Sequence, residues 1–430
     1  MTATRPYGRT TWREALWPVR MERVAIVAPA RSLQDVLRIV GEAGVVELST
    51  PPDAPLQAVS KAAVVRGEVA ALAGWMPARV VPQLAGQVAP EGGAVVPLAR
   101  PRGKEAPSLL RSEGLRGNLA PLVTTYGTTP YADIDPTPLA VGAYMLMFGM
   151  MFGDVGHGLL LLVAAAGLYR KRPRWLSRFH RAWPFAVGAG LASMLFGLLY
   201  GEFFGPTGIV PVLWLRPLAD PITLLAAALA GGALLLAAAY LLGIVNRWRE
   251  GGWPATLYSP AGVAGSALFF GLGLALLGWY ARLGWPLVTG IVVAAVGLTL
   301  AFAGFYAEAG RGASGIAQAV IQLFDAVVRL GANVASFARL AAFGLTHAAI
   351  GSIVWTAAIG LWPATPVAAA AVFLLGNALA LTIEGLVAGV QALRLEYYEL
   401  FSRVFQAEGR PFRPWHLPPT PKEAAPCPSG

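Results

Sequence analysis

The chain has 430 residues, of which 56% are hydrophobic and only 13% are charged. Soluble domains carry about 25% charged residues, and a mean hydropathy of +0.57 leaves too little polar surface to cover this chain in water. The single cysteine excludes a disulfide-rich class. The excess of 33 basic over 23 acidic residues is typical of cytoplasmic membrane loops, so no nucleic-acid partner is expected. The composition predicts a polytopic α-helical membrane protein.

Residues 1–137 carry a soluble-like mixture of charges, and their first 20 residues contain no apolar run typical of a signal peptide. We therefore expect a small cytoplasmic α/β domain here. Residues 21–29 form a strand-like run, and Ser32 is expected to cap the next helix together with Asp35. The rest of this domain is expected to contain a second strand at 45–48, one short helix within 51–73, strand-like structure at 74–77 and mostly loop over 97–137.

Long apolar stretches fill the remainder of the chain, and each exceeds the ~20 residues that span a bilayer. They lie at 138–169, 184–204, 221–246, 260–280, 285–307, 316–355 and 366–402. The first is long enough for two helices, and the segment FGDVGHG (152–158) interrupts it. We therefore expect about eight transmembrane helices within 138–407, followed by a proline-rich, disordered cytoplasmic tail at 408–430.

The basic residues favour eight spans over seven. The loop at 170–182 carries six arginines and lysines, and the loop at 247–259 and the C-terminal end are also basic. Because basic loops stay in the cytoplasm, eight spans leave both termini there, whereas seven would export the N-terminal domain without a signal. We expect a multi-pass protein of the cell (plasma) membrane.

Charged and polar side chains interrupt the span at 316–355, where each charge costs about 3 kcal/mol on insertion scales. On a regular helix they fall on one stripe, about 33 Å long. They are Asp325, Arg329, Asn333, Ser336, Arg339 and His347. Such a stripe indicates a polar path within the membrane.

The last span carries a second set of polar residues. Asn377, Glu384, Gln391 and Tyr398 recur every seven residues and are expected to share a helix face, with Arg394 at its flank. Other polar residues in apolar surroundings are Asp154, His157, Glu202, Glu396 and Glu399.

Structural roles are an alternative for most of these residues. Asp325 and Arg329 are spaced to form an ion pair within one helix, and Asp154 and His157 could brace the helical break. Polar amides and hydroxyls could hold helices together. Arg339 is harder to explain in this way, because it has no carboxylate within one turn and a guanidinium does not lose its proton.

Several segments resemble motifs of the membrane subunit of rotary V-type and archaeal A-type ATPases, called subunit a in eukaryotes and subunit I in bacteria. They are FGMMFGDVGHG (148–158), LYGEFFG (199–205), NVASFARL (333–340) and the stretch from Glu384 through QALRL (391–395) to Glu399. YADIDPT (131–137) and PVRMERV (18–24) fit the same family.

The resemblance implies a stator subunit whose two long, tilted C-terminal helices face a rotor ring. Arg339 would be the essential arginine of ion translocation and Arg394 its partner. Two half-channels for H⁺ or Na⁺, with H⁺ favoured, would contain Glu202, Asp325, Arg329, Ser336, His347, Glu384, Gln391 and Glu399. The implied partners are the c-ring, the peripheral and central stalk subunits, the catalytic head subunits indirectly, and the lipid bilayer.

The chain also departs from this family. We expect it to retain the membrane-proximal lobe of the cytoplasmic arm and to lack the coiled coil and distal lobe, and Glu396 stands where many relatives have histidine. No Walker A motif is present, so we expect no catalytic activity from the chain alone, no cofactor and no metal. A stand-alone ion transporter or channel, and a non-translocating assembly scaffold, are the alternatives.

Overall fold

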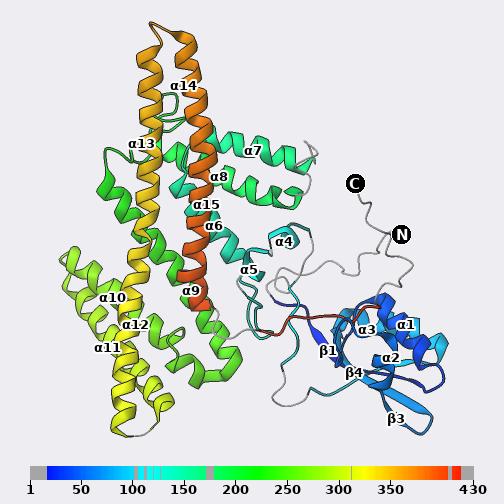
Figure 1. Ribbon diagram of the computed structural model, residues 1–430. Helices are drawn as coiled ribbons and strands as arrows, with labels where there is room; N and C mark the ends of the chain where they lie inside the picture. The colour runs from blue at the N-terminus through cyan, green and yellow to red at the C-terminus, as the bar shows by residue number, and fades with distance from the viewer. Residues whose placement is uncertain are drawn as a thin grey trace. The chain divides into compact units, whose positions relative to one another are not determined.

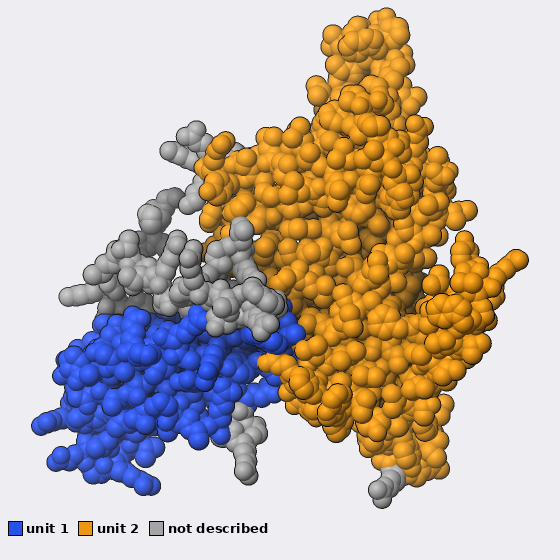
Figure 2. Space-filling model, turned by 180° about the vertical axis from the view of Figure 1, so that it is seen from behind, with its two compact units in different colours: residues 1–111, 127–135, 407–430 blue, residues 112–126, 136–406 orange. Residues whose placement is uncertain are grey.

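The structure, a computed structural model, describes residues 17–100, 105–110, 114–119, 121–125, 127–170, 179–310, 312–404 and 409–417. The chain divides into two compact units, coloured separately in Figure 2. Unit 1 comprises residues 1–111, 127–135 and 407–430, and unit 2 comprises residues 112–126 and 136–406.

Unit 1 is built on an antiparallel sheet of strand order β2-β4-β1-β5, with β3 also paired to β4. The strands are β1 (Met21–Pro29), β2 (Glu47–Leu48), β3 (Val64–Arg66), β4 (Val69–Pro77) and β5 (Ala94–Pro97). β1 and β4 pair along their whole length, from Met21 opposite Pro77 to Pro29 opposite Val69. The expected strand at 21–29 is confirmed.

Helices α1 (Leu33–Ala43), α2 (Leu56–Lys61) and α3 (Val81–Val88) pack on the sheet face that carries Val24, Ile26 and Ala28 (Figure 1). Two short 3₁₀ turns, Ala78–Val80 and Ala89–Glu91, flank α3. The helix expected within 51–73 occupies only α2, because the chain reverses at Gly67, which has a φ of 60°, and begins β3 and β4 there.

The N-cap position expected at Ser32 is confirmed, but the side-chain cap expected there together with Asp35 does not form. Ser32 is the N-cap residue, but its ψ of 5° is far from the extended geometry in which a serine hydroxyl reaches the helix. The Ser32 hydroxyl instead donates to the carbonyl of Pro29 at 3.5 Å, and Asp35 pairs with Arg38 at 3.3 Å.

The chain after the last helix contributes to unit 1. Trp415 is fully buried in its core, where its backbone N–H donates to the carbonyl of Val46 and its indole Nε1 donates to the carbonyl of Ala54. The expected disorder of the C-terminal tail is therefore wrong for residues 409–417, because one large apolar side chain holds the segment in the core. Residues 418–430 lie outside the described part of the chain.

The regular elements described in unit 2 are all helices, and they are joined by loops, of which residues 201–220 form a long one. Its first helices are α4 (Gly114–Leu119), α5 (Pro121–Thr124), α6 (Thr137–Met151), α7 (Val155–Tyr169) and α8 (Trp183–Tyr200). They are followed by α9 (Pro221–Tyr258), α10 (Val263–Tyr280), α11 (Gly284–Ala309), α12 (Ala313–Ser336) and α13 (Ala338–Leu361). The last are α14 (Pro366–Leu379), α15 (Gly385–Leu395) and α16 (Phe401–Val404), joined by π-helical turns at Ala380–Glu384 and Glu396–Leu400.

Within the described residues of unit 2, six helical segments are long and apolar enough to cross a membrane. They are Phe179–Tyr200, Pro221–Tyr258, Val263–Tyr280, Gly284–Ala309, Ala313–Leu361 and Pro366–Val404. α6 and α7 are apolar but shorter, with 15 residues each. By length and composition, the chain is a multi-pass membrane protein with a small N-terminal sheet domain.

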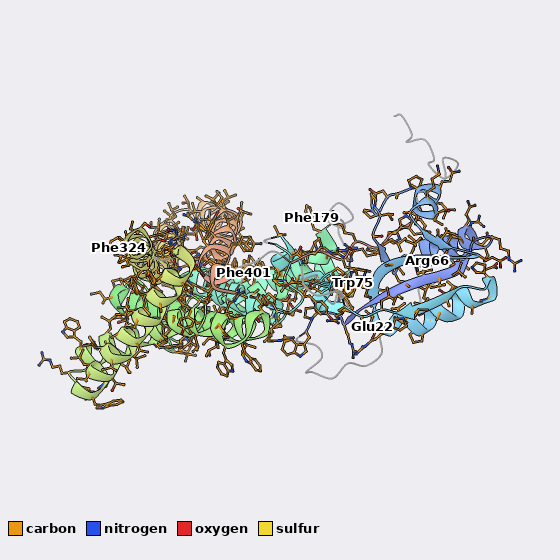
Figure 3. The ribbon with its side chains drawn as sticks, turned by 90° about the horizontal axis from the view of Figure 1, so that it is seen from below. Glu22, Arg66, Trp75, Phe179, Phe324 and Phe401 are labelled. Carbon is orange, nitrogen blue, oxygen red and sulfur yellow. The ribbon has the colours of Figure 1, made fainter. Side chains whose placement is uncertain are left out.

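The two longest apolar segments run side by side in unit 2, with α13 against α14 and its continuation, and the α7–α8 pair lies crosswise to them (Figure 1). Figure 3 shows Phe324 of α12 at the outer edge of unit 2 and Phe401 of α16 inside it, and their exposed fractions are 70% and 2%.

Candidate functional site

The break between α6 and α7 is stabilised by buried hydrogen bonds. Asp154 is the N-cap of α7: its Oδ1 accepts from the backbone N–H of His157 at 2.8 Å, and its Oδ2 accepts from Gly205 at 2.9 Å. The Ser193 hydroxyl donates to the carbonyl of Phe152 at 2.6 Å. The segment FGDVGHG therefore ends one helix and starts the next, and Asp154 has the bracing role that was one alternative from the sequence.

This break brings Asp154 and His157 next to the last two long helical segments. Nδ1 of His347, on α13, lies 2.6 Å from Oε2 of Glu384, which ends the first π turn. The ring centroids of His347 and His157 are 5.5 Å apart, and Nδ1 of His157 is 3.4 Å from Oδ1 of Asp154. We call Asp154, His157, His347 and Glu384 the histidine cluster. Asp154 and the two histidines are each at most 4% exposed.

Glu202 lies in the loop after α8, beside the same cluster. It is 6% exposed, and its backbone carbonyl accepts from the N–H of Val155 at the start of α7. Its carboxylate is close enough to His347, Asp154 and Glu384 for their charges to interact. The structure thus brings together Glu202, His347 and Glu384, three of the residues expected along half-channels.

A second polar cluster forms around Arg339, at the start of α13. Its guanidinium donates to the Ser336 hydroxyl, to Oε1 of Gln391 at 3.5 Å and to Oε1 of Glu399 at 3.5 Å. Ser336 in turn donates to Glu399. We call Ser336, Arg339, Gln391 and Glu399 the arginine cluster. The side chain of Arg339 is 28% exposed and that of Glu399 is 8% exposed, so the ion pair is largely shielded from solvent.

The expected face of the last span is wrong at one residue. Tyr398 was expected to continue the row of Glu384 and Gln391, but it is 71% exposed, whereas Glu399 is buried and meets Arg339. The π turn at Glu396–Leu400 accounts for the difference, because a π turn contains an extra residue and rotates everything beyond it relative to an α-helix.

The remaining candidates lie apart from both clusters. Asp325 and Arg329 form an ion pair of 2.7 Å on α12 with side chains that are 53% and 70% exposed, so the i,i+4 pairing is confirmed but its expected burial is not seen. Arg394 is exposed on α15. Among the described residues, no hydrogen bond or ion pair joins Arg394, Asp325 or Arg329 to Arg339.

Glu396 was left outside the candidate residues, although the structure buries it completely. Neither of its carboxylate oxygens has a hydrogen-bond partner among the described side chains and backbone groups. It lies near Tyr144 of α6, on the side of the helix that faces the interior of unit 2. The spacing of three residues from Glu399 was the signal available in the sequence, because i and i+3 lie on neighbouring parts of a helix surface.

Comparison with known proteins gives the same family as the motifs. Residues 64–214 match the model of the V-type ATPase 116kDa subunit family. A-type ATP synthase subunit I of Pyrococcus horikoshii is 29% identical over 365 residues, covering 80% of this chain and 53% of the relative. The protein of the same name in Archaeoglobus fulgidus is 28% identical over 403 residues, covering 80% and 58%.

A shorter match has higher identity. V-type ATP synthase subunit I 2 of Treponema pallidum is 43% identical over 83 residues, which are 19% of this chain and 18% of the relative. The chain spans about half the length of the archaeal relatives that it matches. The resemblance predicted from the motifs is therefore confirmed: this chain is similar to the membrane subunit of V-type and A-type ATPases, the subunit a or subunit I family.

Proposed function

We propose that this chain is the stator membrane subunit of a V/A-type rotary ATPase or ATP synthase and translocates protons, or sodium ions, against a ring of c subunits. The observation that carries the proposal is the arginine cluster. Arg339 is partly enclosed between two long apolar segments, and its partners Gln391 and Glu399 come from the neighbouring segment.

A permanently charged guanidinium suits this position. When a ring carboxylate passes Arg339, the positive charge favours the ionised carboxylate and so releases its ion. Between passages the same charge repels cations and limits leakage from one side to the other. Lysine can lose its proton when buried, whereas arginine keeps its charge, and the fork of donors lets one side chain reach Ser336, Gln391 and Glu399.

Two separate polar clusters are what two offset half-channels require. Arg339 and His347 are eight residues apart on α13, which corresponds to about 12 Å along the helix. We assign Glu202, His347 and Glu384 to one half-channel, and Ser336, Gln391 and Glu399 to the other. Asp325, Arg329 and Arg394, which are exposed, are proposed to face the rotor ring or the water at a channel mouth.

Exposed apolar side chains on the last two long segments are an argument for a large apolar partner. Phe324, Leu386 and Tyr398 are 70%, 69% and 71% exposed. In a membrane such a surface must be covered by lipid or by apolar helices, and a proteolipid c-ring provides the latter. The peripheral and central stalks, and through them the catalytic head, complete the proposed set of partners.

We further propose eight spans with both termini in the cytoplasm of the cell (plasma) membrane. Residues 21–97 and 409–417 belong to one compact unit, so the chain leaves unit 1 and returns to it on the same side of the membrane. An even number of crossings follows from this proposal and supports eight spans over seven. The six long segments together with α6 and α7, each about 22 Å long and apolar, give eight.

The proposal is tested by ATP-driven ion uptake into inverted membrane vesicles that contain the assembled complex. Arg339→Ala should abolish uptake, and Arg339→Lys should reduce it at least about tenfold because lysine lacks the forked donors. Arg170→Ala, at an exposed arginine at the end of α7, is the matched control and should leave uptake unchanged.

Co-purification in mild detergent checks assembly in each variant. We expect the c-ring and catalytic head subunits to accompany the chain in fixed stoichiometry. Normal uptake by Arg339→Ala would overturn the role of the arginine. Ion transport by the purified chain alone in liposomes would instead support a stand-alone transporter, and assembly with no dependence of transport on this chain would support a scaffold.

A further inference from the structure

The histidine cluster has the composition of a transition-metal site. One ligand atom each from Asp154, His157 and His347 lies within 4.8 Å of the other two. Two imidazoles and a carboxylate are ligands that zinc accepts, and three protein ligands with a fourth open position form a common zinc geometry. Tetrahedral zinc needs ligand atoms about 3.3 Å apart, so rotamer shifts on the order of 1 Å would complete the site.

The hydrogen bonds around the cluster leave its ligand atoms free for this role. Neither ring nitrogen of His157 makes a well-formed hydrogen bond to a described residue, although the side chain is only 1% exposed, and Nδ1 approaches Oδ1 of Asp154 at 3.4 Å. Nδ1 of His347 is engaged by Glu384, which directs Nε2 away from that carboxylate. Each oxygen of Asp154 accepts one backbone hydrogen bond and keeps a second lone pair.

The surroundings also match what a bound divalent cation needs. A carboxylate that holds the outer nitrogen of a metal-binding histidine fixes the ring and raises its basicity, and Glu384 makes this contact to His347. The charges of Asp154 and Glu384, with Glu202 close by, would offset the two positive charges of zinc in a buried place. Phe152 and Phe204 pack against the imidazoles and limit their rotation.

We propose that Asp154, His157 and His347 form a binding site for Zn²⁺, with Glu384 as the outer partner of His347. Because His347 and Glu384 also belong to a proposed half-channel, bound zinc would block ion passage. This inhibition rests on the proposed function, whereas zinc binding itself does not.

Binding is measured on the full chain in detergent, purified with a tag that contains no histidine. The chain has four histidines and one cysteine, so His180→Gln, His416→Gln and Cys427→Ser are combined to remove every other histidine and the thiol. Zinc chloride is the probe, with equilibrium dialysis for stoichiometry and zinc X-ray absorption for ligand type. We expect one zinc per chain with two imidazole ligands at about 2.0 Å.

Variants of the cluster identify the site. His157→Gln and His347→Gln should each weaken zinc binding at least about tenfold, and Glu384→Gln should weaken it about 10- to 100-fold. The background with the three other substitutions should bind as the unsubstituted chain does. Absence of saturable binding, or unchanged affinity in His157→Gln and His347→Gln, would overturn the site. Even where a variant fails to fold, the number of imidazole ligands that X-ray absorption detects on zinc in the chain with an intact histidine cluster still tests the site.

Ion uptake by the assembled complex separates the two proposals. Inhibition by zinc at the concentrations that saturate the site is the expected result. Zinc binding with two imidazoles and no inhibition would overturn the half-channel assignment of His347 and leave the metal site standing. A lack of zinc binding would overturn the metal site alone, because the Arg339 variants test the rotary function independently.

Discussion

Ser336 is the residue that joins the two charges of the arginine cluster. Its hydroxyl accepts from Arg339 and donates to Glu399, while the direct distance between the two charged groups is 3.5 Å. A hydrogen bond to a charged group contributes about 1.5–3 kcal/mol, so this hydroxyl holds the guanidinium more firmly than the ion pair alone. We therefore expect the orientation of Arg339 toward Gln391 to depend on this hydroxyl.

Ser336→Ala should therefore loosen Arg339 without removing any charge. We expect a several-fold lower rate of ATP-driven ion uptake in vesicles with normal assembly of the complex. Thr346→Ala is the matched control, because Thr346 is exposed and its hydroxyl, among the described residues, bonds only to the carbonyl of Ala342 in its own helix. Equal rates in the two variants would show that Arg339 is oriented without Ser336.

The sequence was most informative for residues whose burial is costly. Arg339 was singled out because a permanent charge in an apolar span needs a compensating partner, and the structure supplies Glu399. Residue identity could not tell that Asp325 and Arg329 would be exposed, since helix spacing predicts only that they pair. Glu396 was noted as a polar residue of the span but was not assigned to the site, because its spacing from Glu399 does not show which side of the helix faces the interior.

At the level of secondary-structure elements, the main feature is the close approach of the backbone of α8 to the break between α6 and α7. A Cβ added to Gly197 of α8 would lie 2.4 Å from the backbone nitrogen of Val155 and 2.6 Å from the carbonyl carbon of Asp154. The small residue lets α8 pack directly against the break between α6 and α7, which in turn positions Asp154 and His157. This contact could not be predicted from the sequence, which gives apolar length but not which faces meet.

Gly197→Ala should lower the stability of the detergent-solubilised chain by about 1–3 kcal/mol, because backbone atoms cannot move aside as a flexible side chain can. Gly142→Ala is the control: this glycine of α6 is exposed, and an added Cβ meets nothing within 4 Å. Helix propensity alone makes the control neutral or slightly more stable. Thermal unfolding measures both, and an equal midpoint for the two variants would contradict the close packing.

The last span was predicted at the right place in the chain, but the residues expected to share one of its faces were not all correct. The two π turns are the reason. The length and apolar character of 366–402 predicted the last span well, and the structure extends it to Val404. The seven-residue spacing, however, assumed a uniform α-helix, and π turns leave no reliable trace in composition. The first turn ends at Glu384 of the histidine cluster, and the second begins at Glu396 and contains Glu399 of the arginine cluster.

At the scale of the whole molecule, unit 1 is assembled from both ends of the chain. β1 and β4 form the central pair of the sheet, while Trp415 enters the core between segments that contain Val46 and Ala54. The sequence predicted the strands from local patterns but treated the C-terminal segment as a free tail. The prolines of this segment suggested disorder. No local pattern indicates that Trp415 docks against Ala54, which lies 361 residues earlier in the chain.

Trp415→Ala should destabilise unit 1 by about 3–5 kcal/mol, the usual cost of deleting a fully buried tryptophan side chain. Arg413→Ala is the control, because this arginine is exposed and contacts Glu47 through its backbone N–H. Limited proteolysis of the solubilised protein gives the readout: faster cleavage within residues 21–97 is expected only for Trp415→Ala. Equal cleavage in both variants would mean that the docked segment adds no stability.

The docking of Trp415 also sets an order on biosynthesis. Residues 21–97 leave the ribosome first, yet the core that they form stays open until the last nine described residues of the chain have been made. Every membrane helix is translated in the interval. An interrupted or truncated polypeptide therefore displays an unfilled apolar slot at its N-terminal end, a feature that proteases and chaperones recognise, and only a chain synthesised to its C-terminal segment can close it.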